Sequence, residues 1–303
     1  MKSRRFMLQL ILILIKMTSG SSLPQVVDSH LHLWELERFK YEWPRPTKEN
    51  IIYRDFTPSD YQDEMANTPI TGAVFIEVNE TLEELEWVLG LTQNYSFIKG
   101  VVGYTDMTSP TFEEQIIRLK NNSKFVGLRK IWGDPDWIQR DDVIMGMEVL
   151  ERHNLTFDLL IKTREQYEAA KQFLKRVPKN LKVVLDHLGK PNAVTGAEQW
   201  WFDDIIIMAS YPNVHCKLSG MVTEGNLTSW KQSDFAPYVK HVLDTFGVDR
   251  VMFGSDWPVC KMAHADLPTV YQLLNNLLSE LSENEKRKVF YENAVKFYNL
   301  DMD

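Results

Sequence analysis

The chain has 303 residues, of which 44% are hydrophobic and 25% charged, and its formal net charge is −8 at pH 7. These values are typical of a globular protein and allow a single large domain, because α/β barrels commonly use about 250 residues. The acidic balance, without a basic stripe, excludes nucleic acids and anionic membrane surfaces as expected partners.

The first 22 residues are expected to be a leader or a disordered segment ahead of a domain that spans residues 23–303. Basic residues precede an apolar run at 6–15, and small residues follow at 18–22, as in a secretory signal. The apolar run is too short to cross a bilayer, which needs about 20 residues. Lys16 interrupts the run and speaks against secretion.

Two further features of the sequence bear on the cellular compartment in which the protein works. Only Cys216 and Cys260 are present, whereas a secreted chain of this size more often carries several paired cysteines. Five glycosylation sequons favour the secretory route, but this short pattern also arises by chance; they begin at Asn79, Asn94, Asn121, Asn154 and Asn226. We therefore expect the cytoplasm, with the secretory route as the alternative.

Short apolar runs rich in Val, Ile and Phe alternate with longer segments in which apolar residues have helical spacing. The predicted strands are 26–33, 72–78, 98–104, 125–131, 156–161, 182–186, 214–219 and 251–255. A capping pattern opens a helix at Thr81, Ser109 and Pro110 start another, and a third is predicted over 165–177. Eight such units in about 250 residues predict a single-domain (β/α)8 TIM barrel of the α/β class.

The rival architecture is an open, doubly wound sheet. Such a sheet normally has a glycine-rich phosphate-binding turn after its first strand. The residues that follow the first predicted strand include the run ELER and no glycine. The closed barrel is therefore the favoured prediction.

Candidate functional residues gather at the predicted carboxyl ends of the strands, where the catalytic groups of barrel enzymes lie. They are His30, His32, Glu77, Arg129, Lys130, His187, Lys217, Ser219, Asp256 and Trp257. Alternation along a strand puts His30 and His32 on one face, with about 6.6 Å between their Cα atoms. Two imidazoles at this spacing can converge on one ion or one substrate oxygen.

A lone histidine in an apolar run is more often structural than functional. Here that interpretation must account separately for four residues at the same end of the barrel: His30, His32, His187 and Asp256. Imidazole and carboxylate ligands suit zinc and similar divalent ions. These four residues are therefore expected to hold one divalent ion, zinc or manganese, on the condition that a metal is bound.

Six motifs in chain order resemble the amidohydrolase superfamily, and within it the branch of sugar-lactone and 2-pyrone-4,6-dicarboxylate lactonases. They are DSHLHLW, FVGLRKIW with the nearby DPDW, LTFDLLI, VVLDHLGKP, NVHCKLSGMVTE and RVMFGSDWPVC. The resemblance runs from about residue 26 to about residue 300. It implies a (β/α)8 fold and hydrolysis of a lactone by water activated at the strand ends.

The resemblance also implies roles for individual residues. Asp256 would shuttle protons, and His30, His32 and His187 would bind a divalent ion or polarise the lactone directly. Catalytic roles are thus expected for Asp256, His187 and Arg129. Contacts with the substrate are expected from Lys217, Ser219, Trp257, Lys130 and Glu77.

Two departures from the superfamily pattern qualify these roles. The fifth predicted strand ends in DLL without a histidine, so a two-metal centre is not expected. Lys130 stands where the lactonase branch often has a histidine. Some members of the branch work without metal, and metal-independent catalysis is therefore the alternative to a single ion.

The expected activity is opening of an aldonolactone ring, such as that of an L-fucose- or L-rhamnose-derived acid. One alternative is a metal-dependent decarboxylase of the same superfamily, although the motifs KLSG and GSDWP favour the lactonase. The other is a barrel that binds a sugar acid without catalysis, which would not need to keep all the predicted ligands. The oligomeric state is left open by the sequence, with a homodimer as one option.

Overall fold

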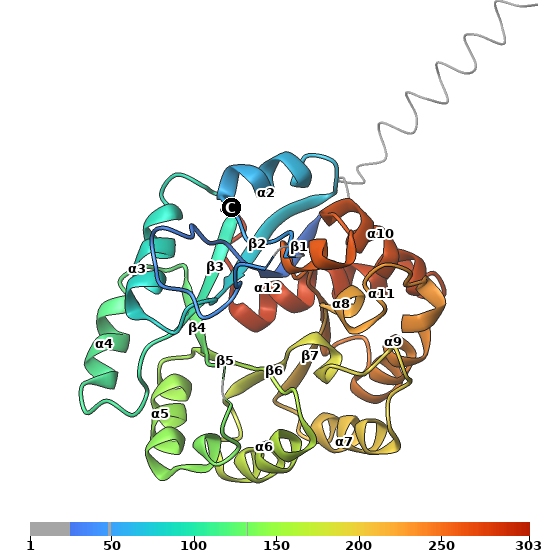
Figure 1. Ribbon diagram of the computed structural model, residues 1–303. Coiled ribbons are helices and arrows are strands. Elements are labelled where there is room, and N and C mark those ends of the chain that lie inside the picture. Colours follow the sequence, from blue (N-terminus) through green and yellow to red (C-terminus); the bar gives the residue numbers. More distant parts are fainter. Residues whose placement is uncertain (1–24, 48–49, 132) are drawn as a thin grey trace, which may run out of the picture.

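The computed structural model describes residues 25–47, 50–131 and 133–303, which form eight parallel strands joined in chain order (Figure 1). The strands are β1 (Val26–Leu31), β2 (Ile70–Ile76), β3 (Ile98–Gly103), β4 (Phe125–Arg129), β5 (Thr156–Leu159), β6 (Lys182–Leu185), β7 (Val214–Leu218) and β8 (Val251–Phe253). The predicted leader, residues 1–22, lies outside the described residues.

The last strand meets the first. Leu31 forms a parallel bridge with Trp257. The Asp256 amide donates to the His30 carbonyl (2.9 Å), and the His32 amide donates to the Trp257 carbonyl (2.8 Å). The predicted single-domain (β/α)8 barrel is confirmed.

Most strands end one or two residues before the predicted positions, and β2 begins two residues earlier, at Ile70. The chain turns sharply at the carboxyl ends, where His187 and Asp256 both have φ of 56°. This left-handed backbone cannot continue an extended strand. These two residues come directly after the predicted sixth and eighth strands, so neither strand can extend past them; the earlier ends of the observed strands have no explanation in this turn.

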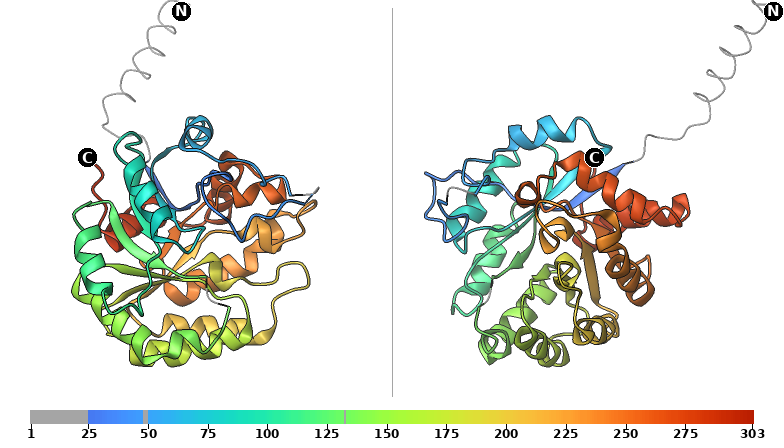
Figure 2. Two further views of the ribbon diagram at one scale, coloured as in Figure 1. Left: turned by 60° about the vertical axis from the view of Figure 1, so that its left-hand side comes forward. Right: turned by 45° about the vertical axis from the view of Figure 1, so that its right-hand side comes forward.

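Helices surround the strands, as both views of Figure 2 show. They are α2 (Pro58–Met65), α3 (Leu82–Leu91), α4 (Phe112–Leu119), α5 (Asp141–Arg152), α6 (Arg164–Arg176), α7 (Gln199–Ala209), α8 (Met221–Glu224), α9 (Gln232–Phe246), α10 (Leu267–Leu277), α11 (Glu283–Arg287) and α12 (Asn293–Tyr298). Short 3-10 segments are η1 (Trp137–Gln139), η2 (His187–Gly189) and η3 (Val259–Ala263), and η4 (Lys288–Glu292) is a π-helical turn.

The predicted helix starts hold to within a few residues. Thr81 caps α3 by accepting a hydrogen bond from the Glu84 amide, and Thr163 forms a capping box ahead of α6. The helix that was predicted to start at Ser109 and Pro110 begins only at Phe112. Ser109 instead accepts hydrogen bonds from the Thr111 and Phe112 amides in a turn before the helix.

Two apolar clusters fill the molecule. The larger one lies between strands and helices. The smaller one fills the amino-terminal part of the barrel interior, where α12 contributes Phe297 and Tyr298. Lys182 at the start of β6 donates to the Phe297 carbonyl, and His215 near the start of β7 lies with its ring centroid 4.7 Å from that of Phe297. The helix α12 therefore closes the end of the barrel opposite to the strand termini described below.

Within the described ranges, no helix is both long enough and apolar enough to cross a membrane.

Candidate active site at the carboxyl ends of the strands

Three imidazoles and one carboxylate converge at the ends of β1, β6 and β8. His30 Nε2 lies 3.1 Å from His32 Nε2 and 3.8 Å from Asp256 Oδ1, and His32 Nε2 lies 3.3 Å from the same oxygen. The ring centroids of His30 and His187 are 4.4 Å apart. All four side chains are buried. The residues that the sequence predicted as metal ligands thus lie together.

The backbone at two of these residues is left-handed. His187 and Asp256 both have φ of 56°. Such a conformation costs about 1–3 kcal/mol in a residue other than glycine and is concentrated at functional sites. Gly220, with φ of 64°, leaves room beside His187, because a Cβ atom there would lie 2.5 Å from His187 Nδ1. The turn after β7 is therefore shaped around the His187 side chain.

Hydrogen bonds at Nδ1 of His32 and at Nδ1 of His187 show which ring nitrogen of each residue faces the site. His32 Nδ1 lies 2.8 Å from the Ile76 carbonyl oxygen, which can only accept. Nδ1 therefore carries the proton, and Nε2 of the neutral ring offers a lone pair. His187 Nδ1 is engaged with the Ser219 hydroxyl at 2.9 Å. Its Nε2 is thus the nitrogen left for the site.

The donor set fits one divalent ion. In the neutral ring of His32, Nε2 is an acceptor, and Asp256 Oδ1 at 3.3 Å is another, so this contact requires a proton or a cation between the two atoms. Ligand atoms around a tetrahedral zinc ion are about 3.3 Å apart, given bonds of about 2.0–2.1 Å. One ligand atom each from His30, His187 and Asp256 also lies within 4.8 Å of the others.

Burial governs the protonation of these groups. It lowers the pKa of His187 to about 3, and it also lowers the pKa of His32. Burial and the Lys217 ammonium hold the pKa of His30 well below its ordinary value. Although burial favours the neutral acid, the neighbouring His187 and His32 keep the pKa of Asp256 below its usual range. The site therefore offers neutral imidazoles and an ionised carboxylate at neutral pH.

Arg129 at the end of β4 is held by two carboxylates. Its Nε donates to Glu77 Oε1 (3.1 Å), Nη1 donates to Asp186 Oδ2 (3.2 Å), and Nη2 donates to the Glu77 backbone carbonyl. Burial raises the pKa of Glu77 to about 7, against the opposing effect of Arg129. Arg129 is thus a fixed, buried cation beside His30, with Nη1 3.4 Å from His30 Nε2.

The predicted substrate contacts divide into two groups. Lys217 is fully buried and contacts His30, and Ser219 contacts His187. The ring of Trp257 is edge-to-face with Phe56. These side chains support the converging groups from behind. By contrast, Lys130 is only partly buried and forms an ion pair with Glu80, which lines the cavity described next.

A cavity of about 700 Å³ opens above the converging groups. Four of the predicted residues line it: His32, Arg129, His187 and Asp256. Its walls are made of Lys40, Glu42, Trp43, Val78, Asn79, Glu80, Ile131, Leu160, Lys162, Lys190, Thr223 and Val259. This volume is in the range of small-molecule sites. The mixture of apolar and polar side chains suits a small ring that carries hydroxyl groups.

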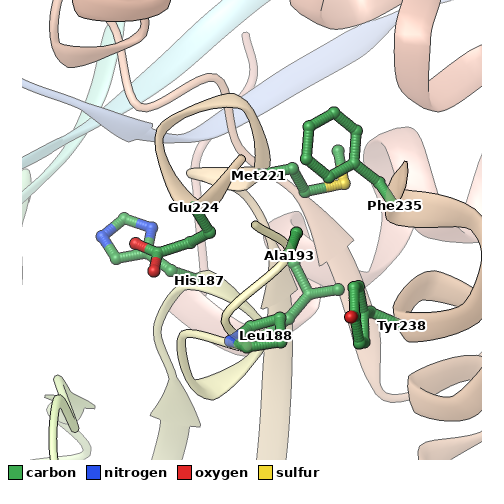
Figure 3. Close-up of a pocket in the computed structure, with 8 residues that line it drawn as sticks. His187, Leu188, Ala193, Met221, Glu224, Phe235 and Tyr238 are labelled. Atoms are coloured by element: carbon green, nitrogen blue, oxygen red, sulfur yellow. The ribbon is translucent and has the colours of Figure 1, made fainter. Parts of the chain in front are cut away.

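A much smaller pocket lies behind His187 (Figure 3). In that view Phe235 and Tyr238 lie on one side of the pocket, whereas the His187 imidazole and the Glu224 carboxylate lie on the other. Glu224 forms an ion pair with Lys190, the residue that follows η2. The pocket has a volume of about 10 Å³, too small for a sugar. Phe235 and Tyr238 of α9 line this pocket together with Leu188, so the turn that carries His187 lies against α9.

Several residues of the site were missed from the sequence. Asp28 accepts hydrogen bonds from the Ser255 amide (2.7 Å) and the Tyr61 hydroxyl (2.8 Å) and so braces the turn before Asp256. The sequence could have indicated Asp28, because this residue lies two positions before His30 and therefore on the same face of the strand. Asp158 and Tyr298 have no comparable signal, since 140 residues separate them in the chain.

A family model described as amidohydrolase matches residues 27–300. The chain belongs to the amidohydrolase family. This amidohydrolase is 32% identical over 287 residues to an L-fucono-1,5-lactonase of Burkholderia ambifaria, covering 91% of this chain and 96% of the relative. It is 25% identical to an L-rhamnono-gamma-lactonase of Scheffersomyces stipitis, covering 91% of this chain and 99% of the relative.

The amidohydrolase also resembles solved structures. A crystal structure of an amidohydrolase from Burkholderia multivorans with bound zinc aligns with a TM-score of 0.85 and 27% identity, and covers 91% of this chain and all of that chain. Together with the converging donors described above, this likeness agrees with the prediction of a divalent metal ion.

Proposed function

We propose that this amidohydrolase opens the ring of a sugar-acid lactone, with L-fucono- and L-rhamnono-lactones as the expected substrates. The observation that carries the proposal is the position of the Asp256 carboxylate against two imidazoles at the base of a cavity of small-molecule size. The lactonase relatives, which align over nearly their whole length, support the choice of substrate.

Lactone hydrolysis needs a base for water, a partner for the developing oxyanion and an acid for the leaving ring oxygen. Asp256 is ionised at neutral pH and takes a proton from the attacking water. The water oxygen bonds to the carbonyl carbon, and the ring C–O bond then breaks. Asp256 returns the proton to the ring oxygen, so that the product is an open-chain hydroxy acid.

The other residues of the cavity floor act on the carbonyl oxygen. Arg129 is a permanent cation in a buried position, and His187 presents Nε2 to the cavity. A divalent ion held by His30, His32, His187 and Asp256 would polarise the carbonyl and lower the pKa of water when bound. Glu77 and Asp186 keep Arg129 in place, and Ser219 does the same for His187.

We propose the cytoplasm as the working compartment. Cys216 and Cys260 are both free and buried, as expected for a chain that needs no disulfide.

The test is a panel of sugar lactones in a pH-indicator assay, run as purified, after chelation, and after zinc or manganese is added back. We expect opening of L-fucono- and L-rhamnono-lactones, and loss of turnover in an Asp256→Asn control. A folded protein that opens no lactone would overturn the proposal. Release of carbon dioxide from an aromatic or unsaturated dicarboxylate would favour the decarboxylase, and binding without turnover would favour the non-catalytic barrel.

A further inference from the structure

The turn between β2 and α3 holds part of the cavity wall in a fixed position. The amides of Val78 and Asn79 donate to the buried Glu84 carboxylate, each at 3.0 Å. Thr81 then caps α3 by accepting a hydrogen bond from the Glu84 amide. Glu80 lies between these anchored positions and lines the cavity. Its backbone is therefore fixed on both sides.

Lys130, the residue that follows β4, fixes the side chain of Glu80. Its ammonium forms an ion pair with Glu80 Oε2. The same Nζ atom lies 5.2 Å from the ring centroid of Tyr104 and 5.3 Å from that of Trp137, within the range of cation–π contacts. Lys130 thus has three partners, and only 17% of its side chain is exposed. The carboxylate that it contacts therefore has a defined position.

The second oxygen of this carboxylate is free to accept a hydrogen bond. Among the residues that the structure describes, none donates a hydrogen bond to Glu80 Oε1. In the same part of the chain, the lining of the cavity includes Glu80 but not Lys130. The pair thus presents its carboxylate, and not its ammonium, to a bound molecule.

Glu80 differs from the other charged groups of the cavity. The lining cations can only donate hydrogen bonds. They are Lys40, Arg129, Lys162 and Lys190. The Glu42 side chain is 85% exposed and lies 3.6 Å from an Arg45 nitrogen, whereas the Glu80 side chain is 30% exposed. Since Asp256 belongs to the floor, Glu80 is the wall carboxylate that is both held in place and shielded from water.

A hydroxyl group that leaves water for a protein cavity needs an acceptor for its hydrogen. A carboxylate provides one, and such charge-assisted bonds are roughly twice as strong as neutral ones. We propose that Glu80 is a specificity-determining residue that accepts hydrogen bonds from ring hydroxyls of the substrate, and that Lys130 is its positioning residue and not itself a substrate contact. The inference rests on the proposed lactonase function and narrows its substrate class to lactones whose hydroxyl groups are free.

Glu80→Gln tests the acceptor. Because the Lys130 ammonium can only donate, it pairs with the amide oxygen of the glutamine and leaves the NH2 group at the position of Oε1. The ring hydroxyl then loses its acceptor, while the size of the side chain is unchanged. Glu86→Gln is the matched control, because it removes the carboxylate of an ion pair with Arg118 that lies between α3 and α4, outside the cavity lining.

The ligands are hydrolytically inert lactams, in which NH replaces the ring oxygen of the sugar lactone, and analogues that each lack one hydroxyl. Binding is measured by calorimetry, so the result does not depend on turnover, and a failure of the lactonase proposal is seen separately in the lactone panel. We expect Glu80→Gln to bind the full lactam about 10–100-fold more weakly than the wild type and Glu86→Gln do. For the analogue that lacks the contacting hydroxyl, this difference should shrink. The same ratio of affinities for every analogue would overturn the proposal, and so would unchanged affinity of Glu80→Gln or a wild type that binds no lactam.

Lys130→Met tests the positioning role. Methionine can keep the contact with the two aromatic rings but releases Glu80. We expect lactam affinity to fall about 3–10-fold, because the Glu80 side chain must then be ordered on binding. Lys130→Arg should restore most of the affinity, and Lys130→Met should have no further effect in Glu80→Gln. An equal loss in both backgrounds would mean that Lys130 contacts the ligand itself, and would overturn its assignment as a positioning residue.

Discussion

Asp256 faces two imidazoles and, in the part of the chain that the structure describes, forms no ion pair with a lysine or an arginine. Replacing it with asparagine therefore leaves no cation of that kind unpaired. Asparagine also tolerates the left-handed φ of 56° better than most residues. We expect Asp256→Asn to fold normally and to lower lactone turnover by about 10²–10⁴, the usual contribution of a general acid–base group.

Turnover and thermal unfolding of Asp256→Asn should be measured on the same preparation. Turnover near the wild-type value would remove Asp256 from the proton-transfer role. A variant that is inactive because it has lost about 3–5 kcal/mol of stability would instead indicate that the carboxylate neutralises a buried charge.

The turn after β7 controls the position of His187. A Cβ atom on Gly220 would lie 2.5 Å from His187 Nδ1 and 2.8 Å from its Cγ, and φ of 64° is itself unfavourable for alanine. We expect Gly220→Ala to displace the imidazole, to break its contact with Ser219 and to lower turnover by at least about tenfold, because misplacement by 1 Å can cost about 10² in rate.

Gly196→Ala is the matched control for this prediction. Gly196 also has a positive φ, of 86°, but nothing lies within 4 Å of a Cβ atom placed there. It should lose about 1 kcal/mol of stability through the backbone and keep full activity. If the two variants lose the same activity, contact with His187 does not explain the effect of Gly220→Ala.

At the scale of elements, the pattern of the sequence was enough to predict the strand order and the convergence of His30, His32, His187 and Asp256. Parallel strands of one barrel all present their carboxyl ends at the same side, so residues at those ends meet regardless of their separation in the chain. The turns were not predictable in this way. The left-handed φ of His187 and Asp256 depends on the space that neighbouring segments leave, as Gly220 does for His187.

The contacts of Lys217 show the same limit. The sequence placed it at the end of β7 and suggested a contact with substrate, whereas its three partners come from β1, β5 and the segment after β6. Depth along the barrel axis distinguishes a residue that faces the cavity from one that lies behind the floor. Alternation along a strand indicates the face of a side chain but not its partners at that depth.

The whole molecule connects its two ends through the barrel interior. The helix α12 covers the amino-terminal end with Phe297 and Tyr298, and the Tyr298 hydroxyl donates to Asp158 Oδ2, which also contacts the Lys217 ammonium. The smaller apolar cluster fills this end of the interior, and the carboxyl end opens into the cavity. The packing of α12 at the amino-terminal end thus holds Asp158, and through it Lys217, in place beneath the candidate active site.

His215, at the amino-terminal end of the barrel, should also contribute to the loss of stability of the fold in acid. Burial lowers the pKa of His215 to about 4, and the cations Arg250, Lys296 and Lys182 act in the same direction. The unfolded chain binds a proton at this residue near pH 6.5, whereas the folded chain does so only near pH 4. The unfolded state therefore binds more protons across this window, and the free energy of unfolding should fall as the pH is lowered from 6.5 to 4.

His215→Gln removes this titration and leaves His187, whose pKa near 3 has the same sign of effect, in place. We expect urea unfolding at pH 7.5 and at pH 4.5 to show a smaller loss of stability in the variant than in the wild type. The difference should be about 1–2 kcal/mol, below the roughly 3 kcal/mol of a fully buried group, because the ring is partly exposed. The same loss in both proteins would mean that His215 does not contribute to the acid sensitivity of the fold.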